Sequence, residues 1–170
     1  MAAGRLFHLG YDADAAARVG FAAALRAWRY DRYGTNLKDK QKPTLKELTI
    51  VGAPAEAAKL WEKRWQPVYD GVAFTRELVT EPANVIYPET FVERVQAAVK
   101  GLGIDLEVLD GDAMRKLGMG ALLGVAQGSV RDPRLLIMRW NGGKDGEAPV
   151  AFVGKGVTFD TGGISIKPPA

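Results

Sequence analysis

Apolar residues in the first part of the chain follow a helical pattern and then an extended one. Between residues 12 and 28 they recur at helical spacing and predict an amphipathic helix. The polar stretch 29–44 carries glycine and proline and predicts a loop, and 45–52 predicts a short strand. The apolar positions that define the helix are Ala15, Val19, Ala22, Ala23 and Leu25.

A second helical pattern begins at Pro54, a residue that is well tolerated in the first turn of a helix. Large apolar and aromatic residues continue the pattern to about Thr80, and Pro67 is the place where the helix would be interrupted. Two prolines and an asparagine in the segment 80–89 then predict a domain boundary.

Beyond this boundary, strands and helices alternate. Residues 88–101 predict a helix and 104–110 a strand, and residues 110–119 predict a short helix with an aspartate near its start, where the helix dipole favours negative charge. Two further strands are predicted at 134–141 and 149–154, joined by a turn-rich connection that indicates a hairpin. The expected architecture is α/β, a mixed sheet flanked by helices.

Composition narrows the class of protein only slightly. The 170 residues carry a net charge of +3, which gives little support to nucleic-acid binding. There is no cysteine, so disulfides, zinc–thiolate sites and cysteine nucleophiles are excluded. The chain lacks a run of about 18 apolar residues, so no membrane span is expected. Without a recognisable secretory signal, the cytoplasm is the default location.

The segment 153–170, VGKGVTFDTGGISIKPPA, combines Lys155, Asp160 and Lys167 with several glycines. A phosphate loop would need a glycine five residues before the Gly-Lys pair and a serine or threonine after the lysine; Pro149 and Gly156 occupy these places, so that pattern fails. Glycines let the backbone approach a ligand closely, and a carboxylate just past a strand lies where open α/β sheets bind ligands. The residues alone therefore predict a ligand site.

The same segment, VGKGVTFDTGGISIKP, resembles the signature of the leucyl aminopeptidase family, which are two-metal exopeptidases with a macro-like N-terminal domain. RELVTEPANVIYPETF resembles the family's approach to its catalytic domain, and LGMGALLGVAQGS with PRLLIMRWNG resembles the stretch that follows. The likeness is strong over 74–170 and weaker over 1–73.

The resemblance implies roles for three residues. Lys155 and Asp160 would be metal ligands, Asp160 bridging two divalent ions (Mn or Zn), and Lys167 would be the catalytic lysine. It also implies a bicarbonate ion, whose arginine is absent here. The family's later patterns, K-x-D-M and D-x-E-x-R, do not occur in these residues. With two ligands of five, the chain is expected to be truncated and inactive by itself.

The resemblance also implies a domain organisation. Residues 1–53 would be the end of a macro-like domain, 54–83 a linker helix, and 84–170 the start of a mixed-sheet catalytic domain of the zinc-exopeptidase type. The implied activity is removal of N-terminal residues from peptides, with leucine preferred, by a cytoplasmic hexamer. The alternative is a non-catalytic assembly or DNA-binding module, which would show salt-sensitive DNA binding without turnover.

Overall fold

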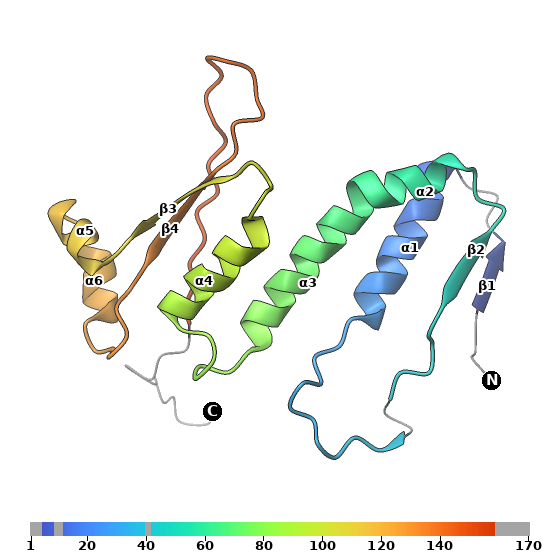
Figure 1. The fold of residues 1–170 in the computed structure, drawn as a ribbon, viewed down its shortest axis with the longest axis horizontal. Coiled ribbons are helices and arrows are strands. Elements are labelled where there is room, and N and C mark those ends of the chain that lie inside the picture. Colours follow the sequence, from blue (N-terminus) through green and yellow to red (C-terminus); the bar gives the residue numbers. More distant parts are fainter. Residues whose placement is uncertain (1–4, 9–11, 40–41, 159–170) are drawn as a thin grey trace, which may run out of the picture. The chain divides into compact units, whose positions relative to one another are not determined.

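A computed structural model describes residues 5–8, 12–39 and 42–158 of the chain (Figure 1). The chain divides into two compact units, Met1–Thr80 and Glu81–Ala170. Among the described residues, no helix is both long and apolar enough to cross a membrane. The three-part division at 53 and 83 stays a prediction.

The first unit begins with two strands and an intervening helix. Strand β1 (Arg5–His8) pairs in parallel with β2 (Leu48–Val51), and helix α1 (Ala13–Ala27) lies between them in the sequence. The side chain of Asp12 caps α1 by accepting a hydrogen bond of 2.8 Å from the backbone N–H of Ala15. The predicted helix and strand are both confirmed.

The second predicted helix is present, and the expected interruption takes the form of a π-helical turn. Helix α2 (Glu56–Leu60) continues into the π-helical turn η2 (Trp61–Trp65) and then α3 (Gln66–Thr80). Pro67 has no N–H, and in a regular helix its ring would clash with the carbonyl four residues earlier. A widened turn directly before a proline relieves that clash, which explains η2.

The π-turn brings Trp65 against α1. The indole N–H of Trp65 donates a hydrogen bond of 2.9 Å to Asp14, and its ring lies 5.2 Å from that of Phe21. The guanidinium groups of Arg18 and Arg64 each lie 5.1 Å from the indole centroid. One tryptophan thus joins α1 to the second helical segment, which packs beside it in the first unit (Figure 1).

The second unit holds an antiparallel pair of strands with helices before and between them. Strand β3 (Asp105–Leu109) pairs with β4 (Leu135–Arg139), Glu107 lying opposite Ile137. The helices are α4 (Pro88–Val99), α5 (Gly111–Lys116) and α6 (Gly120–Ala126). The predicted helices and strands up to residue 141 are confirmed, and so is the α/β fold class; the described strands form two separate two-stranded sheets.

The core of the second unit lies under α4 and α5. Met114 is fully buried, and Ile86, Val92 and Val95 are nearly so. The side chain of Glu81 is also inaccessible and accepts a hydrogen bond of 3.2 Å from Arg94. A buried carboxylate needs such a partner, so this ion pair fixes the first residue of the second unit against α4.

The strand predicted at 149–154 is wrong. The structure gives residues 149–158 no regular secondary structure, so the predicted hairpin is absent as well. Val150, Phe152 and Val153 are 81, 93 and 97% exposed. The reason is physical: the apolar run fits a strand buried on both faces, and no strand among the described residues pairs with it.

Candidate metal centre

Of the three predicted site residues, the structure places only Lys155. It lies between Gly154 and Gly156 in the irregular segment 149–158, and its side chain is exposed. Asp160 and Lys167 lie outside the described residues. The predicted juxtaposition of the three side chains therefore stays a prediction.

The described ranges do not themselves assemble a metal centre. Among them no three histidine, cysteine, aspartate or glutamate side chains come close enough to hold a metal ion. Lys155 could donate to a metal only as the neutral amine, because its charged form has no lone pair. One exposed lysine does not fit a divalent ion, so further donors are needed from outside the described residues.

Glu107, on the β3–β4 sheet, has a structural role and is not a metal ligand in this structure. Glu107 on β3 forms an ion pair with Arg139 on β4 across the antiparallel pair. In the strand register Arg139 lies opposite Asp105, two positions from the partner of Glu107. A diagonal pair of this kind stabilises the sheet and leaves Glu107 as a structural residue.

A polar network at the start of the second unit escaped the sequence analysis. Besides Glu81 and Arg94, Arg134 lies 3.4 Å from Glu89, and the Arg131 guanidinium stacks 4.0 Å from the ring of Tyr87. Several of these partners are far apart in the sequence, 45 positions in the case of Arg134 and Glu89. No periodicity or short motif could reveal them. The contacts of Arg131 and Arg134 hold the start of α4 against the segment before β4.

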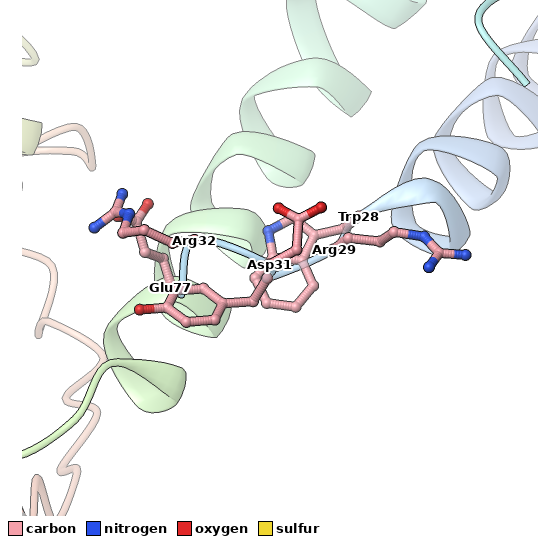
Figure 2. Close-up of a pocket in the computed structure, with 6 residues that line it drawn as sticks. Trp28, Arg29, Asp31, Arg32 and Glu77 are labelled. Carbon is pink, nitrogen blue, oxygen red and sulfur yellow. The ribbon is translucent and has the colours of Figure 1, made fainter. Parts of the chain in front are cut away.

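The described part of the first unit contains an open pocket that no predicted site residue lines. Its volume is about 340 Å³, and its lining consists of Trp28, Arg29, Tyr30, Asp31, Arg32 and Glu77. Arg32 and Glu77 form an ion pair of 2.8 Å and lie together at one end, while Arg29 points the opposite way (Figure 2). Two basic and two acidic groups balance, so the pocket has no net charge to attract an ion.

Two aspartates outside the predicted site have lowered pKa values. The Trp65 hydrogen bond, followed by the charges of Arg18 and Arg64, lowers the pKa of Asp14. The backbone N–H of Ala113 lowers the pKa of Asp110, the N-cap of α5. Both shifts have structural causes, a side-chain contact and a helix cap, and neither indicates a catalytic acid or base.

Comparison with known structures agrees with this fold. The chain resembles a tomato leucine aminopeptidase mutant with a TM-score of 0.62 and 25% identity, over 78% of this chain and 28% of that one. It also resembles the bottromycin maturation enzyme BotP in complex with Mn, with a TM-score of 0.60 and 25% identity, over 74% and 25% of the two chains.

Comparison of sequences identifies the family more specifically than comparison of structures. Curated relatives named probable cytosol aminopeptidase include those of Bradyrhizobium sp., 52% identical over 91% of this chain, Caulobacter vibrioides, 50% over 94%, and Rhodopseudomonas palustris, 54% over 91%. The chain spans 31, 32 and 31% of these relatives' lengths. Residues 73–170 match the catalytic domain of the cytosol aminopeptidase family. With more than half of its residues matched in this way, the chain belongs to the cytosol aminopeptidase family.

Proposed function

We propose that this chain is part of a metal-dependent aminopeptidase that releases N-terminal residues, leucine preferred, from peptides. The observation that carries the proposal is the identity of about half of all aligned residues with probable cytosol aminopeptidases. The family match extends through Lys155, Asp160 and Lys167. The proposed setting is a cytoplasmic hexamer.

The three candidate residues have distinct proposed roles. Lys155 and Asp160 would hold two divalent ions, Mn or Zn, with Asp160 between them. Bound ions of this kind supply a water molecule activated for attack at neutral pH. Binding requires Lys155 to lose its proton, because only the neutral amine has a lone pair to donate to a metal ion.

Lys167 is assigned the charge-stabilising role. A protonated amine beside the scissile carbonyl favours the negative charge that develops on the oxygen during attack. Lys167 therefore has to remain protonated, whereas Lys155 has to be deprotonated. A bicarbonate ion would serve as the proton shuttle. In the resemblance described above an arginine holds this ion, and that arginine is not among the three residues assigned here. By themselves, the residues of this chain provide too few ligands for turnover.

Leucine release by the complete gene product tests the proposal. Lys167→Ala and Asp160→Asn should each lower kcat by at least about 100-fold, the scale of losing a charge-stabilising group. Lys144→Ala and Asp145→Asn are matched controls, since both residues are exposed in the turn that precedes the segment. Full activity of the Lys167→Ala protein would overturn the assignment.

The assembly or DNA-binding alternative predicts a different result. It requires self-association or salt-sensitive DNA binding with no leucine release at any metal concentration. None of the contacts described above favours it over the peptidase, so it remains the second hypothesis.

A further inference from the structure

The three asparagines of the chain are all exposed and lie outside helices and strands, but they differ in the residue that follows. The pairs are Asn36 before Leu37, Asn84 before Val85 and Asn141 before Gly142. The backbone nitrogen of the following residue is the group that can attack an asparagine side chain. Glycine leaves this nitrogen open to approach and lets the backbone adopt the conformation that the attack needs. Asn141 is therefore the asparagine best placed for an intramolecular reaction.

The backbone around Asn141 leaves the attacking nitrogen available. Asn141 and Gly142 follow β4, in a segment without regular secondary structure. Within the described part of the chain, the backbone N–H of Gly142 makes no hydrogen bond. By contrast, the N–H of Val85, which follows Asn84, donates a hydrogen bond of 2.9 Å to the carbonyl of Pro82. The nitrogen beside Asn84 is thus engaged, whereas the one beside Asn141 is not.

The exposure of this turn follows from its own composition. Lys144, Asp145 and Glu147 come within five positions after Gly142. Charged side chains are almost never fully buried unless they are paired. A neighbouring segment that covered the turn would have to satisfy all three charges. We therefore expect the turn to stay at the surface when this chain forms part of a longer protein.

Packing of Trp140 explains why a glycine follows Asn141. A Cβ atom at position 142 would overlap the indole ring of Trp140. Any other residue at this position would have to displace the ring, so the position needs glycine as long as Trp140 keeps its place. The reactive pair is therefore a consequence of how the chain leaves β4.

We propose that Asn141 is a site of spontaneous deamidation. The backbone nitrogen of Gly142 attacks the side-chain carbonyl carbon of Asn141, and a new C–N bond closes a cyclic imide. The side-chain nitrogen leaves as ammonia with the proton from the backbone N–H. Water then opens the ring at either carbonyl and gives aspartate or a β-linked isoaspartate. Water is the sole co-reactant, no electrons are transferred, and the inference does not rest on the proposed peptidase activity.

Both products change the turn in a measurable way. Each adds a negative charge, and isoaspartate also lengthens the main chain by a methylene group between β4 and the segment that carries Lys155. The purified complete gene product should therefore accumulate acidic forms that ion-exchange chromatography separates. Their amount should rise with time and with pH, because removal of the proton from the backbone nitrogen promotes its attack.

Mass spectrometry of peptides from the complete gene product tests the site, after incubation at mildly alkaline pH both folded and in urea. In the folded protein, Asn141 should convert at least about 10-fold faster than Asn36 or Asn84, because it alone precedes glycine. Asn141 should convert at similar rates in both states, whereas Asn84 should be slower when folded because the Val85 N–H is bonded. Equal rates at the three sites, or conversion of Asn141 in urea alone, would overturn the proposal.

Variants of the same pair provide the controls. Asn141→Gln keeps the amide but needs a larger ring for the same attack, so the acidic forms should disappear. Asn141→Asp carries the product charge from the start and marks where the acidic form elutes. Gly142→Ala should slow conversion at least about 10-fold by hindering the nitrogen, and circular dichroism checks that the shifted Trp140 leaves the protein folded. Acidic forms that persist in Asn141→Gln would contradict the assignment.

Discussion

The helical pair of the first unit and the segment 149–158 of the second are similar in apolar content but differ in how that surface is covered. In the first unit, the indole of Trp65 is held by Asp14, Phe21 and two arginines. In the second, Phe152 and Val153 extend into solvent. An amphipathic helix finds its partner within the same unit, whereas a strand apolar on both faces needs neighbouring strands, which the described residues do not supply.

The second unit should have a hydrophobic core of its own, as the first unit has. Met114 is the strongest test of this core because it is fully buried. Met114→Ala should lower the free energy of unfolding by about 3 kcal/mol through lost burial and a cavity. Met138→Ala, at a half-exposed position on β4, is the control and should change it by less than about 1 kcal/mol. Urea denaturation followed by circular dichroism distinguishes the two, and equal effects would show that α5 contributes no separate core.

The buried ion pair of Glu81 stabilises the start of the second unit. Glu81→Ala leaves Arg94 without its buried carboxylate, and we expect a loss of about 2–3 kcal/mol, below the value for fully buried pairs because Arg94 is partly exposed. Asp112→Ala removes the exposed pair with Arg115 and should cost at most about 1 kcal/mol. The same urea titration measures both, and an effect of Glu81→Ala no larger than the control would contradict the structural role.

Features that depend on interactions between residues close in the sequence could be predicted, whereas features that depend on distant residues could not. Helix α1 could be placed almost to the residue because its apolar spacing is a local signal. Pro67 correctly marked the interruption of the second helix, because the steric demand of its ring is a local signal, and the π-helical turn Trp61–Trp65 lies just before it. The strand predicted at 149–154 failed because pairing depends on residues elsewhere in a protein.

The candidate site residues and the polar contacts near the start of the second unit differ in the same respect. Lys155, Asp160 and Lys167 could be proposed from a contiguous signature, because their residue types and spacing are visible in one short stretch. The polar network around Glu81, Glu89 and Arg134 could not, since it depends on which distant segments the fold brings together.

The cap of α1 is a smaller test of the first unit. Asp12→Ala removes the acceptor for the Ala15 N–H and should cost about 1 kcal/mol, whereas Asp12→Ser retains a capping oxygen and should recover most of it. Thermal unfolding of the three proteins measures the difference. If Asp12→Ser unfolds as early as Asp12→Ala, the hydrogen bond is not the source of the cap's effect.

The smallest expected effect is a pH dependence. Because the folded pKa of Asp14 is lowered from 3.8, chiefly by the Trp65 hydrogen bond, its contribution is present above the unfolded pKa and is lost as pH falls through the folded one. Trp65→Phe keeps a ring but removes the N–H donor, so it should reduce the loss of stability below pH 3.8. Urea titrations of both proteins at pH 3 to 6 measure this loss of stability. An unchanged pH dependence in Trp65→Phe would show that the lowered pKa of Asp14 has another cause.

The manganese content of the complete gene product tests whether the glycine-rich segment holds metal ligands and a separate catalytic lysine. After dialysis against limiting Mn²⁺, Lys155→Ala and Asp160→Asn should retain much less metal than the natural protein, because each removes a ligand. Lys167→Ala should retain the full amount while losing activity. Full metal content in the Lys155 and Asp160 variants, or loss of metal from the Lys167 variant, would contradict the assignment.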